Sequence, residues 1–511
     1  MSSAEESSQV GSKNEGVLSE ELAEGIDYSS PSHQEISKLR EAVFLFLLCL
    51  SQLITQISVG QTMGTGNYIA RTFHVEGMPG EMAWFTAAFS LSVGTFILIS
   101  GRLGDMYGYK TMYLIGYAWY AVWSLATGFA AFVPNRIFFQ TMRSMQGIGP
   151  AIMMPNTQAL IGSYFPDGTK KFVYLSLFGA VAPSGFVIGS LLSGTFAQLV
   201  WWPWTFWLSG MGSVLAAVIA FFIIPKHIGH KSYGSFDWYG SVTGVSGLIL
   251  INFALNQGPN VGWDTPYVYV LLIVGVLFMG AFYLIEKRVA NPLVPPDVLR
   301  GDTGFVLGCI TAGWACFGVW LYYTFRWSIE VDHLSPVLAA AQISPAIITG
   351  YIAALASAYL LQTISLSYVM VISMCAFFIG CTLQATRPVG QIYWAQKFFS
   401  FLIASMGIDL SFPSACIILS QALPRHRQGI AGSLVSTFVN YSISVGIGLA
   451  SAVEVYTTKN KTPSFNTTVT GMRNAFYLGM GCAGFGIVLS VIFVVIQFRA
   501  KMKKERTSGL Q

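Results

Sequence analysis

The chain has 511 residues, of which 53% are hydrophobic and only 10% are charged. A soluble globular protein carries about 25% charged residues, so this much apolar surface cannot all be buried in soluble cores. The net charge of +5 does not indicate a nucleic-acid partner, because the basic residues are not gathered into one patch with interleaved aromatic residues. Composition therefore predicts an integral membrane protein whose main surroundings are the lipid bilayer.

The N-terminal segment differs from the rest of the chain. Residues 1–40 are rich in serine and glutamate and contain almost no aromatic residues. A segment of this composition cannot bury enough apolar surface to fold, so we expect a disordered tail and no signal peptide. The seven cysteines form no CxxC motif and no cluster with histidine, so neither a disulfide framework nor a metal site is expected.

Long apolar runs follow, and a membrane-spanning helix needs about 20 predominantly apolar residues. We predict one span for each of fourteen runs: 43–62, 81–101, 111–133, 136–160, 172–197, 204–224, 238–257, 267–286, 303–325, 337–360, 366–385, 392–421, 429–453 and 474–498. The runs do not show the alternation of polar and apolar residues that is typical of a membrane β-barrel. The expected fold class is therefore an all-α integral membrane protein.

Lysine and arginine indicate the orientation, because they are enriched in cytoplasmic loops. They are more frequent in the loops that follow even-numbered spans and in the basic tail 499–511. This places both termini in the cytoplasm and requires an even number of spans. The last outer loop carries two N-x-T sites, at Asn460 and Asn466, where glycosylation is possible.

A weak internal repeat suggests how the spans are grouped. The stretches 147–166 and 405–424 align on Pro155 and Pro413, and spans 1 and 9 begin with nearly the same offset. Spans 1–6 and 9–14 are therefore interpreted as two copies of one six-helix unit. Many transporters build a substrate site near the membrane midplane from paired halves of this kind. From the N-terminus, the predicted organisation is a tail 1–40, a bundle 41–225, two inserted helices in 226–300, a bundle 301–498 and a tail 499–511.

The stretch GRLGDMYGYK, residues 101–110, lies between the second and third spans. Glycines at Gly101, Gly104 and Gly108 suit a tight turn. Asp105 can cap a helix or pair with a basic residue of a neighbouring helix. A contact of this kind can be made in one conformation and broken in another. We interpret these residues, together with Lys110, as a conformational latch, and a merely solvated turn is the alternative.

This stretch resembles the signature loop of the major facilitator superfamily, although Met106 and Tyr109 stand where basic residues are usual. RSMQGIG at 143–149 resembles the span-4 motif of proton-coupled members, and GFVIGSLLSG at 185–194 resembles the span-5 motif of fourteen-span exporters. With GIDLSFPSACIILS at 407–420, the chain is most similar to the fungal drug:proton antiporters of the aminotriazole-resistance and boron-export subgroup. The resemblance implies the superfamily's transporter fold, with fourteen spans arranged as six, two and six.

The span-5 motif is rich in small residues, which let helices approach closely. Its helix-packing positions are Pro183, Gly185, Gly189 and Gly194. The resemblance associates this motif with export, and packing alone is the alternative.

Two ionisable residues, Arg143 and Asp409, lie well inside predicted spans, where a charge costs about 2.5–3.5 kcal/mol on insertion scales. By the resemblance, spans 1, 4, 9 and 12 line a central cavity, so both residues are expected to face water. Desolvation disfavours an ionised carboxylate and a nearby cation favours it. We interpret Asp409 as the residue that loads and releases a proton, and Arg143 as the group that tunes it or binds an anionic group. A structural charge satisfied by backbone or buried water is the alternative for each.

Polar residues supply further candidates. Gln52 and Gln56 are one turn apart on span 1 and share a face, which is a candidate substrate-binding surface together with Gln146. Hydrogen bonding between helices is the alternative. For Asn252 and Asn256, which share a face of the first inserted helix, packing is the favoured interpretation.

The resulting hypothesis is a monomeric secondary transporter that exports a small polar toxic solute, such as an aminotriazole-like heterocycle or boric acid, in exchange for protons. The plasma membrane is the expected location, with the vacuolar membrane as the alternative. Inward transport of ammonium or another small nitrogen compound is a rival, and a non-transporting nutrient sensor is a second. Enzymatic activity and a cofactor are not expected, since no nucleophile triad, metal cluster or phosphate loop occurs in the sequence.

Overall fold

The computed structural model describes residues 37–165, 168–225, 236–289, 291–295, 298, 301–422 and 428–508. The chain divides into two compact units, residues 1–42 and 43–511. Of the first unit only residues 37–42 are described, so the predicted tail lies almost wholly outside the described residues. The same is true of the predicted inner loops at 226–235 and 423–427.

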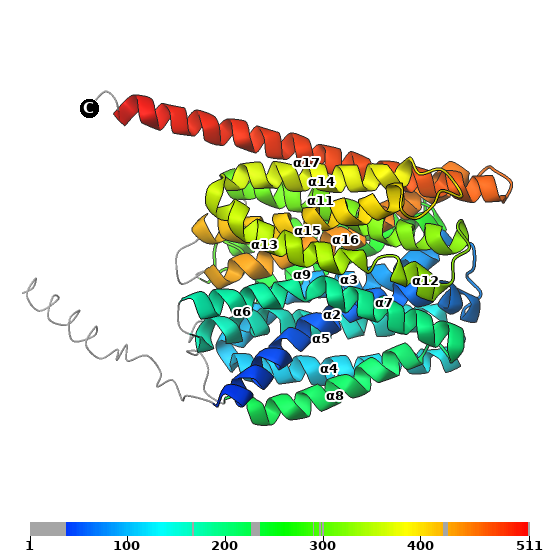
Figure 1. Ribbon diagram of the computed structural model, residues 1–511, viewed down its shortest axis with the longest axis horizontal. Coiled ribbons are helices and arrows are strands. Elements are labelled where there is room, and N and C mark those ends of the chain that lie inside the picture. The colour runs from blue at the N-terminus through cyan, green and yellow to red at the C-terminus, as the bar shows by residue number, and fades with distance from the viewer. Residues whose placement is uncertain are drawn as a thin grey trace, which may run out of the picture. The chain divides into compact units, whose positions relative to one another are not determined.

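Helices occupy all of the predicted spans, and no β-strand occurs in the described part of the chain. The first group consists of α2 (Lys38–Thr72), α3 (Pro79–Tyr107), α4 (Tyr109–Phe129), α5 (Arg136–Tyr164), α6 (Thr169–Ala180), α7 (Ala182–Leu199) and α8 (Trp204–Ile223). In this group α5 packs against both α3 and α4, and α4 packs against α8 (Figure 1).

The second group follows a pair of intervening helices. Its members are α11 (Gly301–Glu330), α12 (Pro336–Ala341), α13 (Pro345–Thr363), α14 (Leu366–Ala385), α15 (Gln396–Ala422), α16 (Gln428–Thr458) and α17 (Phe465–Ser508). Here α14 packs against α15 and α17, and α11 packs against α16 and α17. The two groups meet where α3 packs against α16 and where α7 packs against α12 and α13.

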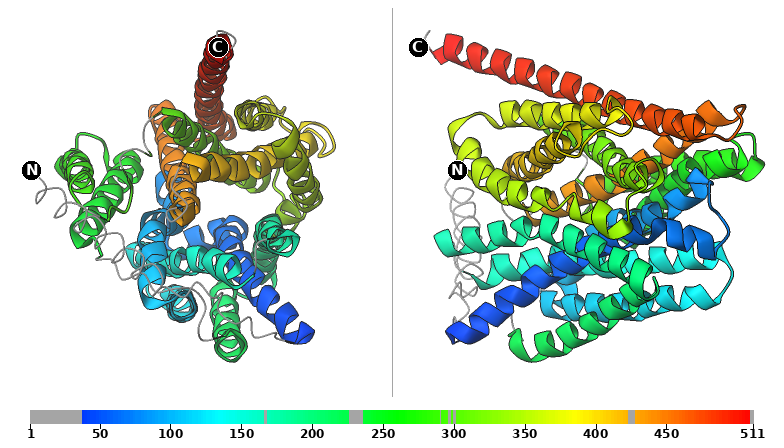
Figure 2. Two further views of the ribbon diagram at one scale, coloured as in Figure 1. Left: turned by 90° about the vertical axis from the view of Figure 1, so that its left-hand side faces the viewer. Right: turned by 45° about the vertical axis from the view of Figure 1, so that its right-hand side comes forward.

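The intervening helices are α9 (Trp238–Val261) and α10 (Pro266–Glu286). They pack against each other, and α9 also packs against α3 and α16, as Figure 2 shows from two sides. Asn256 donates to Asn252 Oδ1 (2.9 Å), and that oxygen also accepts from Ser444 of α16 (2.9 Å). These two asparagines therefore take part in helix packing at the place where α3 and α16 meet.

Two segments predicted as single spans are broken by the backbone. The segment 172–197 divides at Val181 into α6 and α7, and Pro183 stands in the first turn of α7. The segment 337–360 divides between α12 and α13, and each piece begins with a proline. Proline lacks a backbone N–H and is tolerated best in the first turn of a helix, so it favours a new helix start at both places.

Hydropathy gives a lower span count than the sequence pattern. Among the described residues, twelve helical stretches are long and apolar enough to cross a membrane. The predicted segments missing from this set are α4 and α5, each longer than 20 residues. Tyrosine and tryptophan are frequent in α4, and α5 carries both Arg136 and Arg143. The protein is thus an all-α membrane protein with about twelve to fourteen spans, and the exact number of fourteen stays a prediction.

Candidate functional site

Arg143 lies about two turns from the N-terminus of α5 and is fully buried. Its guanidinium donates to the backbone oxygens of Ser58 (2.8 Å) and Phe85 (3.3 Å) and to the amide oxygens of Gln61 and Gln146. No ion pair with a carboxylate is found for it within the described ranges. The sequence placed Arg143 facing water, whereas here neutral oxygens inside the first helix group satisfy its charge.

Two glutamines hold this arginine, and one of them was not among the predicted site residues. Gln146 accepts from Arg143 and donates to Ser124 of α4, so its amide is occupied in helix packing. Gln61 of α2 accepts from Arg143 (3.4 Å) and donates to the backbone oxygen of Thr205 in α8 (3.1 Å). Its only sequence signal was that it is a third glutamine on the first span.

The predicted pair Gln52 and Gln56 is less constrained. Gln52 is buried, and its Oε1 has no hydrogen-bond partner among the described residues. Gln56 is half-buried and lies against Gly185 of α7, where a β-carbon added to the glycine would come within 3.0 Å of Gln56 Cβ. Gln56 therefore lies where α2 crosses α7, and Gln52, one turn earlier on α2, has an amide oxygen without a partner in the described structure.

Asp409 lies in α15, and its Oδ2 is buried without a hydrogen-bond partner in the described structure. A β-carbon added to Gly350 of α13 would lie 3.6 Å from this oxygen and 2.8 Å from Pro183 of α7. Asp409 therefore lies where α7 of the first group meets α13 and α15 of the second. No hydrogen bond or ion pair joins it to Arg143 in the described structure, so the two predicted proton-coupling residues belong to separate places.

The small residues of the span-5 motif pack α7 against α2. A β-carbon on Gly185 would lie 2.7 Å from the backbone oxygen of Leu53, and one on Gly189 would lie even closer to that of Ile57. Gly194 instead faces α12, where a β-carbon would lie 3.0 Å from the carbonyl carbon of Pro336. The motif therefore serves two contacts, one inside the first helix group and one with the second.

The predicted latch is mostly helical rather than a turn. α3 continues to Tyr107, and only Gly108, with φ at +95°, separates it from α4. Gly101 is a close-packing position instead, because its β-carbon would lie 3.1 Å from Ser433 Oγ of α16. Gly104 packs in the same way against Asn156 of α5. The glycines of this motif were assigned to a turn because sequence cannot distinguish a turn glycine from one at a helix crossing.

The charged residues of this motif make contacts at the ends of α3 and α4. Asp105 accepts from Tyr109 Oη (2.9 Å) and lies 4.0 Å from Arg102 of its own helix. Tyr109, which replaces a usual basic residue, supplies the hydrogen bond. The N-cap of α4 is Gly108 and receives no side-chain hydrogen bond, so of the two expected roles Asp105 does not take that of a helix cap. Lys110 donates to the backbone oxygens of Phe221 (2.8 Å) and Ile224 at the end of α8, which are the carbonyls that a helix leaves unpaired.

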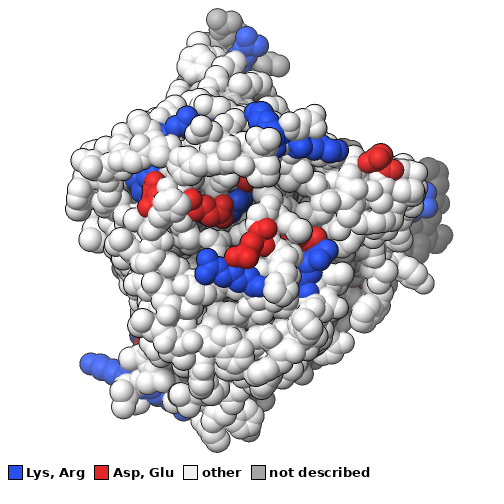
Figure 3. Space-filling model, turned by 90° about the vertical axis from the view of Figure 1, so that its right-hand side faces the viewer, with Lys and Arg blue, Asp and Glu red and all other residues white. Residues whose placement is uncertain are grey.

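Charged side chains gather across the middle of one face, in surroundings that are largely uncharged (Figure 3). Arg326 of α11 holds two carboxylates: its Nε and Nη2 donate to Glu330 (3.0 and 2.9 Å), and its Nη1 donates to Glu454 of α16 (2.7 Å). Tyr323 also donates to Glu454 (2.8 Å). We call Arg326, Glu330 and Glu454 the Arg326 charge cluster. Sequence reasoning missed it because no motif links residues this far apart.

A second set of charges lies beside it. Arg387 (Nη2, 2.8 Å) and Lys397 (Nζ, 3.6 Å) both approach Asp332 Oδ2, and Lys397 also donates to Ser328 Oγ (2.7 Å). Burial lowers the pKa of Arg387, which lies between α14 and α15, and the Asp332 carboxylate opposes that shift. A guanidinium remains protonated in proteins, so Arg387 and Asp332 form an ion pair that holds this loop against the end of α11.

The two predicted glycosylation sites are accessible. Asn460 follows α16 and Asn466 lies in the first turn of α17, and both are exposed. Glycosylation at either position stays a prediction.

Comparison with known proteins agrees with the helical architecture. A family model described as the Major Facilitator Superfamily matches residues 48–448. A crystal structure of a POT family transporter in complex with a thioalcohol-conjugated peptide superimposes with a TM-score of 0.66, covering 89% of this chain and 96% of that one. The two sequences are 13% identical, so this similarity shows the fold alone.

Fungal sequences are much closer. The low affinity ammonium transporter of Saccharomyces cerevisiae is 44% identical and covers 92% of this chain and 91% of its own length. The efflux pump terJ of Aspergillus terreus is 39% identical and covers 92% of each chain. The aminotriazole resistance protein of S. cerevisiae is 36% identical, covering 90% of this chain and 85% of its own. These matches confirm the resemblance to fungal drug-resistance transporters, and the chain belongs to the major facilitator superfamily, whose members are membrane transporters and not enzymes.

Proposed function

We propose that this transporter is a proton-coupled exporter of a small polar toxic solute. In this proposal it acts as a monomer in the plasma membrane, with both termini in the cytoplasm. The bundles 41–225 and 301–498 rock against each other around a site between them, and the two helices within 226–300 are a lateral addition. Two relatives, an efflux pump and an aminotriazole resistance protein, support the direction and the solute class.

The observation that carries the proton coupling is the unpartnered oxygen of Asp409, in the described structure, where the two helix groups meet. A buried carboxylate without a cation or donor favours its protonated form, and access to water favours ionisation. Rocking of α7 against α13 changes the surroundings of this carboxylate, because both helices flank it. Asp409 would therefore take up a proton in one conformation and release it in the other.

The test compares yeast cells that overproduce the wild-type chain, Asp409→Asn or Asp302→Asn. The control position Asp302 lies in the first turn of α11 and is exposed. Asp302→Asn therefore removes one negative charge, as Asp409→Asn does, but at a position outside the proposed site. We expect resistance to 3-amino-1,2,4-triazole from the wild type and the control, and loss of resistance from Asp409→Asn at equal surface abundance. Full resistance of Asp409→Asn would remove this residue from the mechanism.

Uptake of ammonium is a second candidate, supported by the relative named as an ammonium transporter. Cells that overproduce the chain separate the two directions. Export predicts faster loss of preloaded labelled aminotriazole, whereas uptake predicts faster growth on limiting ammonium. Failure of labelled aminotriazole or a labelled ammonium analogue to undergo counterflow in proteoliposomes would favour the sensor alternative.

A further inference from the structure

Two buried carboxylates lie side by side where α9 begins and α10 ends. Asp237 directly precedes α9 and Glu286 is the last residue of α10, and the two residues are 5% and 3% exposed. A β-carbon added to Gly240 of α9 would lie 2.9 Å from Glu286 Oε1 and even closer to Asp237 Oδ2. The two carboxylates therefore flank one small space, which exists because residue 240 has no side chain.

Each carboxylate uses one oxygen to bind the backbone and leaves the other oxygen without a partner. Asp237 Oδ1 accepts from the backbone N–H of Gly240 (2.8 Å), and Glu286 Oε2 accepts from that of Val294 (3.2 Å). Asp237 Oδ2 and Glu286 Oε1 have no hydrogen-bond partner among the described residues. These are the two oxygens beside Gly240, so both unpartnered atoms are directed toward the same space.

No described cation neutralises these two acids. Lys287 and Arg288 follow Glu286 in the chain, but both are exposed, and Lys287 Nζ lies over the Tyr283 ring, 4.3 Å from its centroid. The helices α3 and α16, which pack against α9, bring no described charged side chain within ion-pair distance of either acid. Like charges this close repel, and burial adds to the cost of ionising both carboxyls.

Two facing oxygens of this kind suit a proton better than a metal ion. A proton on one carboxyl makes it a donor to the other, so a single proton satisfies both free oxygens and removes one negative charge. A water molecule would donate but leave both charges in place. A calcium ion needs about six to eight oxygen ligands. No group of three or more histidine, cysteine or acidic side chains that could hold a metal occurs in the described ranges.

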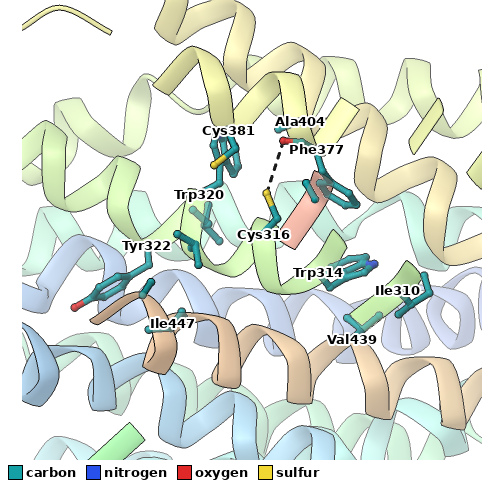
Figure 4. Packing of buried hydrophobic residues seen from close by; sticks show 14 of the residues in the cluster. Ile310, Trp314, Cys316, Trp320, Tyr322, Phe377, Cys381, Ala404, Val439 and Ile447 are labelled. Carbon is teal, nitrogen blue, oxygen red and sulfur yellow. Dashed lines mark hydrogen bonds between the residues drawn. The ribbon is translucent and has the colours of Figure 1, made fainter. Parts of the chain in front are cut away.

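The two acids also connect the inserted helices to the second helix group. Val294, whose N–H binds Glu286, is buried and belongs to the hydrophobic cluster around α11. Figure 4 shows part of this cluster, in which Trp314 of α11 lies near Phe377 of α14 and Val439 of α16. The carboxylate at the end of α10 therefore holds a segment that is packed into the core of the second group.

We propose that Asp237 and Glu286 form a proton-binding site, in which one proton is shared between Asp237 Oδ2 and Glu286 Oε1. The shared proton joins α9 to α10 and, through Val294, to the segment before α11. Its release would leave two repelling carboxylates beside Gly240 and weaken this junction. The site is separate from Asp409, and it depends neither on the transported solute nor on the direction of transport.

Infrared spectroscopy of the purified full-length chain in nanodiscs at neutral pH tests the site directly, because a protonated carboxyl has a C=O stretching band that a carboxylate lacks. Glu286→Gln and Asp237→Asn should each remove one carboxylic acid band, since each leaves a single carboxylate that accepts from the new amide. The control Asp302→Asn, at an exposed position on α11, should remove none. Asp409 is present in all of these samples, so its own band cancels in the difference spectra.

The melting temperature provides a second measurement. The folded pair holds a proton that the separated side chains of an unfolded chain release above about pH 4, so the free energy of unfolding falls as the pH rises. The amide in either variant donates the same hydrogen bond without a proton. Between about pH 5 and pH 9, the melting temperature of the wild type should therefore fall by several degrees more than that of either variant. A purely structural role would instead lower the melting temperature of the variants equally at every pH.

Two results would overturn the proposal: acid bands that persist in both variants, or parallel pH profiles for the wild type and both variants. It would also be overturned if calcium, magnesium or potassium chloride raised the melting temperature of the wild type but not of the variants, because a metal ion would then occupy the space. Each variant is informative by itself, so the second decides if the first does not fold. Failure of the resistance test at Asp409 would refute the proposed export mechanism and leave this site standing.

Discussion

Arg326 of α11 and Glu454 of α16 form a buried ion pair, in which Nη1 lies 2.7 Å from Oε2 and the side chains are 7% and 5% exposed. The pair joins α11 and α16, two helices of the second group. Glu330 binds the same guanidinium from the next turn of α11, so the arginine is held in one orientation from two sides.

Replacement of Glu454 by glutamine is expected to destabilise the protein. Removing one partner of a buried ion pair costs roughly 3–5 kcal/mol, and the lower end applies here because Glu330 still compensates the arginine. The measurement is the melting temperature of the purified protein. Glu76→Gln is the matched control, because its pair with Arg71 is exposed and worth about 1 kcal/mol or less. Equal melting temperatures for the two variants would contradict this account.

Because α2 and α7 cross closely at Gly189, we expect a single added methyl group there to destabilise the folded protein. The new β-carbon would overlap the backbone oxygen of Ile57, so the helices must separate, at a cost of about 1–3 kcal/mol. Gly189→Ala should therefore lower the melting temperature. Gly212→Ala on α8 adds the same methyl group where nothing in the described structure lies within 4 Å, and it should leave stability unchanged or raise it slightly. Similar losses in both variants would show that α2 and α7 are not in close contact.

The helices could be predicted from sequence because length and apolar composition act locally. The breaks at Val181 and before Pro345 were missed, since a proline is compatible both with a bent helix and with a new helix start. The environment of Arg143 was not predictable, because two of its partners are backbone oxygens, which leave no pattern in the sequence. The Arg326–Glu454 pair joins residues 128 positions apart, and only the fold brings them together.

Two arginine-to-lysine substitutions on α5 are expected to differ in their effect on stability. Lysine keeps the charge but lacks the planar fork that reaches the oxygens of Ser58 and Phe85 together, so Arg143→Lys should lose about 1–3 kcal/mol of stability. Arg136→Lys is the control, because Arg136 is 45% exposed and makes a simple ion pair with Glu81. Melting temperatures of the two variants test this. An unchanged value for Arg143→Lys would mean that the hydrogen bonds to these oxygens do not hold α5 in place.

The contact between Asp105 and Tyr109 predicts an effect on turnover that is separate from binding. It joins the last turn of α3 to the first turn of α4, and α3 also packs against α16 of the other helix group. A hydrogen bond to a charged group contributes about 1.5–3 kcal/mol, so its loss shifts a two-state equilibrium by about tenfold or more. If the contact is made in only one transport conformation, Asp105→Asn should slow proteoliposome transport by about tenfold while equilibrium binding stays unchanged. Tyr109→Phe removes the same bond from the other side and should slow transport in the same way, whereas Tyr107→Phe, at an exposed neighbouring position, should not. Normal turnover in both Asp105→Asn and Tyr109→Phe would show that this contact only connects α3 to α4 and does not change during transport. The proposed latch would then have no part in the mechanism.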